Sequence, residues 1–254
     1  MRKYIYFNQQ IIPAENAFLS AISSAPLYGK GVFTTVAIHD SIPFLWDKHW
    51  RRLTEHAGKV GISLIEFSEP AVEKSLLETI AQNNLQSGRA RLTFFDESPS
   101  SVWQIASNSR TNLLIQTADL RPAPESFRLT VSPYPVNSTS PLAGVKSCNY
   151  LENILALEHA KAKGFDEAVR LNEKDEIVSA CMANIFWRKN NKVYTPKLET
   201  GCLKGTTREF FMENFAVEER KAKLAELHKA DEIFLTSAGL GIVKASEFIR
   251  SKNS

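Results

Sequence analysis

The chain has 254 residues, of which 43% are hydrophobic and 23% are charged, and its formal net charge at pH 7 is +3. This composition is ordinary for a folded globular protein, and the length allows one large domain or two small ones. The small charge and the interspersed acidic and basic residues argue against a nucleic-acid partner. No apolar run is long enough for a signal peptide or a membrane span.

The cysteines and histidines exclude further classes of protein. The three cysteines, Cys148, Cys181 and Cys202, are an odd number without Cys-x-x-Cys spacing. Such a set favours a reduced, cytoplasmic protein. The five histidines are scattered without the spacing of metal ligands, so we expect no metal site.

The first half of the chain mixes strand and helix patterns. Strands are predicted at residues 4–7, 11–13, 32–38, 42–44, 90–95 and 112–116. Apolar residues at helical spacing predict one helix with Trp50, Leu53, Ala57 and Val60 and a second with Val72, Leu76 and Ile80. Two prolines and scattered charge then mark residues 119–125 as a linker.

The second half continues the mixture. Strands are predicted at residues 127–131, 167–172, 185–189 and 233–236, and one helix runs from Leu151 to a C-terminal Gly164. The charged run at 218–223 is typical of a solvated helix surface. Because strands and helices do not alternate regularly, we expect an α+β fold. The predicted domains are 1–118 and 126–254, and the second carries Lys146.

Lys146 is the most informative residue of the chain. It follows an apolar Leu-Ala-Gly-Val approach and precedes a helical pattern. A lysine that does covalent chemistry must lose its proton far below its free pKa of about 10.4. Partial burial lowers the pKa because it penalises the ammonium form.

Several ordered motifs accompany this lysine. Residues 144–150 read Gly-Val-Lys-x-x-Asn-Tyr, and they are followed by Ala-Asn-x-Phe at 183–186, Thr-Pro at 195–196, Leu-x-Gly-x-Thr-Arg at 203–208 and Phe-Leu-Thr-Ser at 234–237. Upstream stand Tyr-Gly-x-Gly-Val-Phe at 28–33 and His-x-x-Arg at 49–52. This series resembles the class IV aminotransferases, which are fold-type IV enzymes of pyridoxal 5'-phosphate (PLP). The resemblance runs from about residue 5 to residue 247.

The resemblance implies a two-domain fold like that of D-amino acid aminotransferase and assigns roles to several residues. Lys146 becomes the residue that holds PLP, while the PLP phosphate falls to Arg52, Thr206, Thr207 and Ser237. Thr206 and Glu209 also have capping-box spacing, which indicates a helix N-terminus suited to an anion. Near the phenolic oxygen of PLP the natural candidate is Tyr150, although a core tyrosine is an equal reading.

One position departs from the family. The family places a Glu five residues before the Asn of Ala-Asn-x-Phe, where it keeps the pyridine nitrogen protonated, and this chain has Ser179 there. A neutral hydroxyl cannot balance a pyridinium charge, so we expect a weaker electron sink. Glu176 can substitute only if the end of the strand is re-registered, because an offset of three residues points it to the other face of a strand.

Two details favour one subgroup of the family. Phe-Thr-Thr at 33–35 replaces the usual Phe-Glu-Thr, and the residues after Asn184 are similar to those of 4-amino-4-deoxychorismate lyase. A branched-chain or D-amino acid aminotransferase remains an alternative, as does a PLP-binding homologue with little turnover. We expect Tyr28, Thr35 and Arg91 at the substrate, and the family implies a homodimer.

Overall fold

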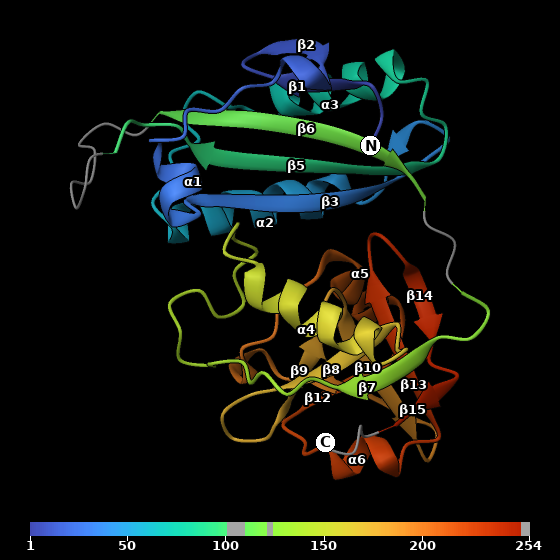
Figure 1. The fold of residues 1–254 in the computed structure, drawn as a ribbon. Coiled ribbons are helices and arrows are strands. Elements are labelled where there is room, and N and C mark those ends of the chain that lie inside the picture. Colours follow the sequence, from blue (N-terminus) through green and yellow to red (C-terminus); the bar gives the residue numbers. More distant parts are fainter. Residues whose placement is uncertain (101–109, 121–123, 250–254) are drawn as a thin grey trace. The chain divides into compact units, whose positions relative to one another are not determined.

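The computed structural model describes residues 1–100, 110–120 and 124–249, and these form two compact units (Figure 1). Unit 1 comprises Met1–Arg121 and Val145–Asn149, and unit 2 comprises Pro122–Gly144 and Tyr150–Ser254. The segment with Lys146 therefore groups with unit 1, whereas the sequence analysis placed it in the C-terminal domain. The reason is its backbone pairing with a strand of unit 1, described below. Residues 121–123 of the predicted linker lie outside the described residues.

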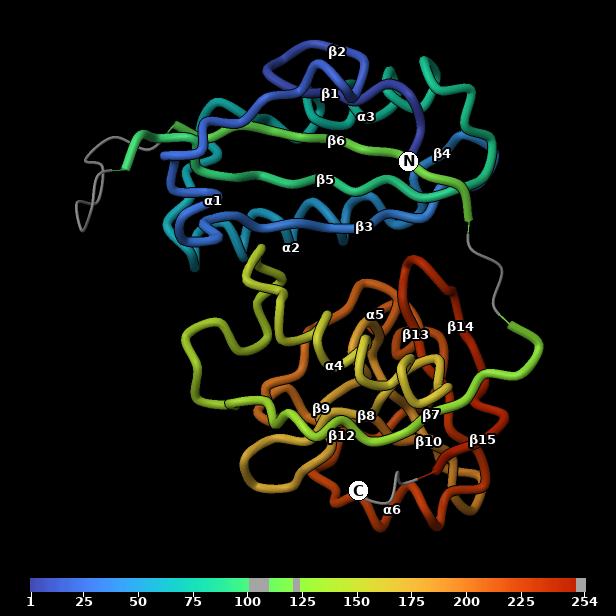
Figure 2. The backbone as a smooth tube through the Cα atoms, in the orientation of Figure 1, coloured from blue at the N-terminus to red at the C-terminus, as the bar shows by residue number. Residues whose placement is uncertain are grey.

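Unit 1 is built on one six-stranded antiparallel sheet, and its long central strands run side by side in the tube of Figure 2. Its order is β2-β1-β6-β5-β3-β4. The strands are β1 (Tyr4–Phe7), β2 (Gln10–Pro13), β3 (Gly31–His39), β4 (Ile42–Pro43), β5 (Gly88–Asp96) and β6 (Thr111–Asp119). Five of the six contain the strands that periodicity predicted, and β4 ends one residue short of the predicted 42–44.

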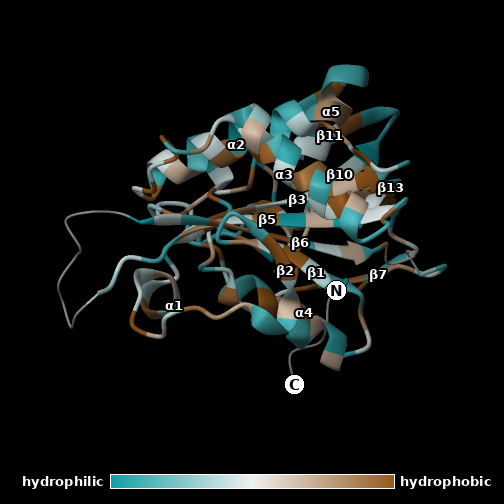
Figure 3. Ribbon diagram, turned by 90° about the horizontal axis from the view of Figure 1, so that it is seen from above, coloured by the Kyte–Doolittle hydropathy of each residue, from teal (hydrophilic) through white to brown (hydrophobic). Residues whose placement is uncertain are grey.

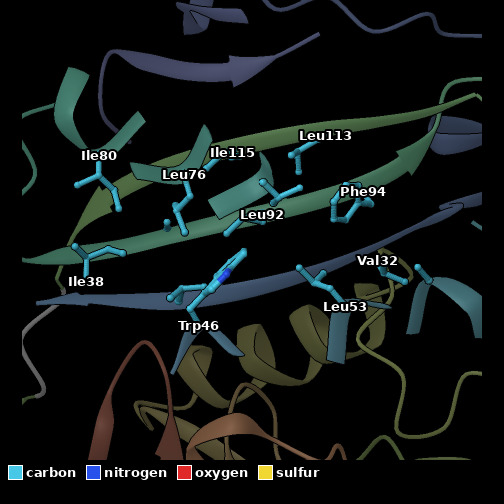
Figure 4. Close-up of a cluster of buried hydrophobic side chains, with 14 of the residues drawn as sticks. Val32, Ile38, Trp46, Leu53, Leu76, Ile80, Leu92, Phe94, Leu113 and Ile115 are labelled. Carbon is cyan, nitrogen blue, oxygen red and sulfur yellow. The ribbon is translucent and has the colours of Figure 1, made fainter. Parts of the chain in front are cut away.

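Two helices, α2 (Trp46–Lys59) and α3 (Glu69–Gln82), cover one face of this sheet, and a short helix α1 (Ser24–Tyr28) precedes β3. Both long helices carry hydrophobic and hydrophilic residues, as Figure 3 shows. Their apolar side meets the alternate residues of the strands in one cluster (Figure 4). Leu53, Leu76 and Leu92 are each at most 1% exposed in it. Burial of such side chains stabilises the unit by about 1.5–3 kcal/mol each.

Unit 2 contains two sheets. The four-stranded sheet has the order β15-β7-β8-β9, with β15 (Glu247–Phe248), β7 (Arg128–Val131), β8 (Glu167–Leu171) and β9 (Ile177–Ala180). The five-stranded sheet has the order β12-β11-β10-β13-β14, with β12 (Val217–Arg220), β11 (Lys192–Pro196), β10 (Asn184–Lys189), β13 (Glu232–Ser237) and β14 (Gly241–Lys244). One apolar cluster, with Leu129, Trp187 and Leu235 at its centre, includes residues of both sheets.

Three helices belong to unit 2: α4 (Leu151–Ala162), α5 (Thr206–Asn214) and α6 (Ala225–His228). Helix α4 buries Ala156 and Ala160 in a cluster with Ala168 of β8. On α5, Phe211 packs against Phe186 of β10 and Phe234 of β13, with ring centroids 5.0 and 5.3 Å away. These aromatic contacts hold α5 against β10 and β13.

Two local expectations are wrong. The charged run at 218–223 is not a helix: its first residues lie in β12, an edge strand that pairs with β11 in parallel. Charged residues suit an exposed sheet edge as well as a helix surface, because they discourage pairing with another chain. The capping box is also wrong, because Gly205 is the N-cap and Thr206 is already the first helical residue.

Among the described residues, no helix is both long enough and apolar enough to cross a membrane.

Candidate active site

The segment around Lys146 continues the sheet of unit 1 beyond β3. Ser147 forms an antiparallel bridge with Val32. The Phe33 N–H donates to the Lys146 carbonyl at 2.9 Å, and the Cys148 N–H donates to the Gly31 carbonyl at 2.8 Å. These bonds fix the backbone of the lysine against a rigid strand, which is the support that a precise catalytic group needs.

The glycines of the Tyr-Gly-x-Gly-Val-Phe motif leave room for this segment. Gly29 has a positive φ of 63°, and a Cβ there would lie 2.7 Å from the Asn149 Oδ1 atom. At Gly31 a Cβ would lie 2.8 Å from the Cys148 Sγ atom. The Asn149 amide also donates to the Gly29 carbonyl at 3.0 Å. The motif therefore has a packing reason: side chains at either position would displace the lysine segment.

Lys146 lies among aromatic and cationic groups of unit 1. Its Nζ atom is 4.3 Å from the ring centroid of Phe33, and the Arg91 guanidinium carbon is 3.6 Å from the same centroid. Burial holds the pKa of Lys146 well below the ordinary value of a lysine, and the charges of Arg52 and Arg91 lower it further. A lowered pKa favours the neutral amine, which is the form that covalent chemistry requires.

Arg52 is buried, with 8% exposure, on the face of α2 that meets β3. Its Nη2 atom donates to Thr34 Oγ1 at 2.7 Å, and that hydroxyl is 2.6 Å from His49 Nδ1. Burial, followed by the charges of Arg52 and Lys146, holds the pKa of His49 well below its usual value. A neutral His49 and a neutral hydroxyl therefore orient the guanidinium.

His56 makes the most direct contact between α2 and the lysine segment. Its Nδ1 atom accepts a 3.0 Å hydrogen bond from the backbone N–H of Lys146. Burial lowers the pKa of His56 to about 4, and the Arg52 charge contributes to that shift. The ring is therefore neutral at pH 7 and can serve as the acceptor.

Two of the predicted substrate residues share one cavity. Thr35 and Arg91 are directly opposed in the β3–β5 register, and with Gln116 of β6 they line a cavity of about 270 Å³. A larger cavity of about 430 Å³, mainly apolar, is lined by neighbouring residues that include Thr93, Phe95 and Cys148. Tyr28 lines neither cavity; it ends α1 and is 47% exposed.

In unit 2, the predicted phosphate residues Thr206 and Thr207 open helix α5. The N-cap, Gly205, supplies no side-chain hydrogen bond to the helix. A Cβ at Gly205 would collide with the Asn184 Oδ1 atom, and the Asn184 amide donates to the Leu203 carbonyl at 2.7 Å. The Asn of Ala-Asn-x-Phe thus fixes the loop before the helix, whose N-terminus is suited to an anion.

Ser237 and its neighbour Thr236 close β13. The Ser237 Oγ atom accepts a 3.2 Å hydrogen bond from the Leu240 N–H, so this hydroxyl stabilises the turn into β14. The Thr236 Oγ1 atom is buried and has no hydrogen-bond partner in the structure. Such an orphaned hydroxyl is unusual, because buried polar atoms normally find a partner.

The remaining two predicted cofactor residues lie elsewhere in unit 2. Ser179 is half-buried in β9, directly opposite Arg170 of β8. Tyr150 is the N-cap of α4 and is half-buried, so the two readings of this tyrosine both remain open. Glu176 precedes β9, and its carboxylate accepts a hydrogen bond from the Asn172 side-chain amide at 3.0 Å. The carboxylate therefore stabilises the turn before β9.

These residues fit a PLP molecule by their chemistry. Taken by itself, unit 1 has a lysine whose pKa is lowered and a buried arginine; unit 2, taken by itself, has a helix N-terminus with a glycine N-cap and a buried hydroxyl without a hydrogen-bond partner. A Schiff-base amine and an anion site are what PLP demands of a protein. Ser179 stands where the family has a carboxylate, so this position differs from the family's pattern.

The sequence analysis missed His56, Thr34 and Arg170. His56 had a usable signal, because His49, Arg52 and His56 have i, i+3 and i+7 spacing on the buried face of a helix. Polar residues on such a face require partners. Thr34 and Arg170 gave no such signal, because their neighbours are known only from the strand register.

The comparisons with known proteins identify the family of this chain. The family model for amino-transferase class IV matches residues 31–248, so the chain belongs to that family. It is a PLP-dependent class IV enzyme of α+β fold, as the motifs predicted.

Individual relatives differ in activity. The aminodeoxychorismate lyase of Bacillus subtilis is 27% identical over 94% of this chain and 84% of its own. A Methanocaldococcus jannaschii protein with the provisional name branched-chain-amino-acid aminotransferase is 29% identical, over 96% of this chain and 87% of its own. The branched-chain aminotransferase structure from Escherichia coli shares the fold, with a TM-score of 0.91, 22% identity and coverage of 98% of this chain and 87% of its own.

Proposed function

We propose that the protein is a lyase of the 4-amino-4-deoxychorismate type, which releases 4-aminobenzoate and pyruvate with PLP bound through Lys146. The depressed pKa of Lys146, caused by burial and by Arg52 and Arg91, is the observation that carries the catalytic assignment. When bound, PLP supplies an electron-withdrawing ring that stabilises negative charge at the substrate carbon.

The chain's own residues then perform three tasks. Arg52, with Thr206 and Thr207 at the start of α5, holds the PLP phosphate, and a guanidinium suits two phosphate oxygens at once. The Lys146 Nζ atom takes up and returns the substrate proton, a role that its lowered pKa favours. Thr35 and Arg91 bind the polar groups of the substrate, a role that is supported by the cavity that they line together.

Two observations support the lyase. Ser179 stands where the family has a carboxylate, so the ring withdraws less charge. A reaction driven by an aromatic product tolerates this better than reversible amino transfer does. Thr34 also replaces the usual Glu of the aminotransferases, and its hydroxyl bonds Arg52. The 27% identity with the Bacillus subtilis lyase points the same way.

A branched-chain or D-amino acid aminotransferase is the second candidate, favoured by the 29% identity with the Methanocaldococcus jannaschii protein. A PLP-binding homologue with little turnover is the third. For each we propose a cytoplasmic homodimer. The odd number of cysteines and the lack of Cys-x-x-Cys spacing support a reducing compartment.

One two-substrate assay tests the proposal. The purified protein with PLP is given aminodeoxychorismate, and the release of 4-aminobenzoate and pyruvate is followed. In parallel it is given L-leucine, L-valine or D-alanine with 2-oxoglutarate, and glutamate is measured. We expect turnover in the first reaction and at least tenfold less in the second.

Lys146→Arg is the negative control, and Lys163→Arg, an exposed lysine after α4, is the matched control. Faster amino transfer than lysis would select the aminotransferase. Absence of both reactions in a protein that binds PLP would select the third candidate.

A further inference from the structure

Arg170 and Ser179 are a cross-strand pair. They are directly opposed in the antiparallel register of β8 and β9. Directly opposed residues of such a pair place their side chains on the same face of the sheet, about 4.5–5.5 Å apart at Cβ. The position at which the family holds a carboxylate therefore has an arginine as its cross-strand neighbour, next to a register irregularity between Arg170 and Leu171.

The Arg170 side chain is 3% exposed and is incompletely paired. Its Nη1 atom donates to Asn153 Oδ1 at 3.2 Å, and its Nη2 atom lies 3.4 Å from Glu152 Oε2 and 3.5 Å from the Pro135 carbonyl. The Nε atom is buried without a hydrogen-bond partner. Arginine stays protonated in proteins, so this is a desolvated positive charge.

Glu152 offsets this charge only in part. Its side chain is 75% exposed, and an ion pair with one solvated partner contributes little. The long distance of 3.4 Å weakens it further, because strong charge-assisted hydrogen bonds measure about 2.7–2.9 Å. The positive charge of Arg170 is therefore only partly compensated, on the face of the sheet that Ser179 shares.

The other nearby carboxylates are committed to the backbone or to turns. Glu167 is buried, and it accepts hydrogen bonds from the N–H groups of Ala168, Cys181 and Met182 at 3.2, 2.9 and 2.9 Å. It also lies three positions from Arg170, so its Cα–Cβ bond points to the opposite face of β8. Glu176 bonds Asn172 before β9 begins.

We propose that Arg170 is an electrostatic positioning residue that keeps the pyridine nitrogen of PLP unprotonated, with the Ser179 hydroxyl as the hydrogen-bond donor to that nitrogen. This inference rests on the proposed PLP function and refines it. A like charge within about 4–6 Å disfavours a protonated ring nitrogen, and a hydroxyl can donate to a neutral one. The site is thereby adapted to reactions in which the PLP ring withdraws little negative charge from the substrate carbon.

The first test measures binding rather than turnover. The affinities of the full-length apoprotein for PLP and for N-methyl-PLP, whose ring carries a fixed positive charge, are compared by equilibrium dialysis. The native protein should bind N-methyl-PLP at least tenfold more weakly than PLP. Arg170→Leu should narrow this ratio to about threefold or less, while Arg188→Leu, in the other sheet of unit 2, should leave it unchanged.

A steric effect of the methyl group is separated from charge by a second readout. PLP labelled with ¹⁵N in the ring is bound to the protein, and its ¹⁵N chemical shift is recorded between pH 6 and 8. The native protein should show the shift of a neutral pyridine across this range. Arg170→Lys, which keeps the charge, should preserve that shift, and Arg170→Leu should move it toward the protonated value.

The outcomes separate the two proposals. Failure of PLP to attach to Lys146 would contradict the proposed function itself. A protonated ring nitrogen in the native protein, with PLP normally attached, would overturn the role of Arg170 alone. Since the native measurement needs no variant, an Arg170→Leu protein that failed to fold would not remove the test.

Discussion

The backbone N–H of Lys146 donates to the Nδ1 atom of His56 at 3.0 Å, so the segment that carries the lysine is hydrogen-bonded to helix α2 as well as to β3. His56 is 3% exposed, and burial lowers its pKa to about 4. The unprotonated Nδ1 atom is the acceptor, so protonation there would break the contact.

The pH dependence of stability follows from this shift. Between pH 6.5 and 4 the unfolded chain binds a proton at His56 and the folded chain does not, so the free energy of unfolding falls as the pH falls. The contribution of His56 to this loss is about 2 kcal/mol between pH 7 and 5. Urea unfolding followed by tryptophan fluorescence measures it.

Two variants make this a test of His56 itself, because His49 shifts in the same direction. His56→Gln keeps an acceptor without a titrating group, so its loss between pH 7 and 5 should be smaller by about 2 kcal/mol. His56→Leu leaves the Lys146 N–H unpaired and should cost about 1–3 kcal/mol at pH 7. Equal pH dependence in the native protein and His56→Gln would contradict the assignment.

We predict that PLP attaches to Lys146. Reduction of the PLP-loaded protein with borohydride, followed by peptide mapping, should place the pyridoxyl label on that residue, because burial and the charges of Arg52 and Arg91 depress its pKa. Lys30 is the internal control, since it forms a 2.8 Å ion pair with Asp96 and should stay unlabelled. A label on another lysine defeats the assignment.

Gly31 provides a test of the lysine's position that leaves the lysine intact. A Cβ at Gly31 would lie 2.8 Å from Cys148 Sγ and 3.0 Å from the Phe94 carbonyl, so Gly31→Ala should displace the Lys146 segment. Such overpacking costs about 1–3 kcal/mol, and PLP affinity should fall at least tenfold. Thermal unfolding and PLP titration measure the two effects.

Gly58→Ala is the matched control. Gly58 lies inside α2, and a Cβ there has no atom within 4 Å. The substitution should stabilise the protein by about 0.5–1 kcal/mol, because alanine favours a helix more than glycine does. If both alanines left PLP affinity unchanged, the packing reason given for the glycine motif would be wrong.

Much of the fold follows from periodicity, because the apolar residues that define each long element also form its buried face. Leu53, Leu76 and Leu92 were predicted in helices and a strand and lie in the core. Strands β9, β11, β14 and β15 were missed, because they are at most five residues long and no alternation of apolar residues marks them. The run at 218–223 failed because charge alone does not separate an exposed helix from an edge strand.

The site was less predictable in its contacts than in its residues. The motifs located Lys146, Arg52 and the start of α5, but they gave no neighbours. The Arg170–Ser179 pair depends on which residues face each other across two strands, and a slip of one residue would place them on opposite faces. No local pattern fixes that register, so the charge beside Ser179 could not be derived from the sequence.

The proposed homodimer makes a prediction about exposed apolar residues in unit 1. Phe18 and Ile22 are 79% and 63% exposed between β2 and α1, and Phe18 also lines the larger cavity. We expect Phe18→Asp/Ile22→Asp to yield a monomer in sedimentation at micromolar concentration, because buried charge opposes association. Ile65→Asp, at a residue 93% exposed, is the control and should leave the dimer intact. A fully active native monomer would refute the dimer.

The last prediction concerns amino transfer after Ser179→Glu. A carboxylate at this position should raise the pKa of the ring nitrogen, because an opposite charge favours the protonated form by about one to three units. If charge withdrawal limits the rate, single-turnover release of keto acid from L-leucine should quicken by roughly tenfold or more. The PLP content of the two proteins must be matched for this comparison.

Arg170 should limit the gain in this variant. The new Glu would be directly opposite Arg170 in the strand register, so an ion pair with Arg170 would weaken its effect on the ring nitrogen. The double variant Ser179→Glu/Arg170→Leu should therefore release keto acid faster than Ser179→Glu. The rate of Arg170→Leu alone should lie between the rates of Ser179→Glu and the native protein. Stopped-flow rates of the native protein, the two single variants and the double variant form a double-mutant cycle, which gives the interaction between the two positions. Unchanged rates in variants that bind PLP normally would mean that Ser179 does not face the ring nitrogen.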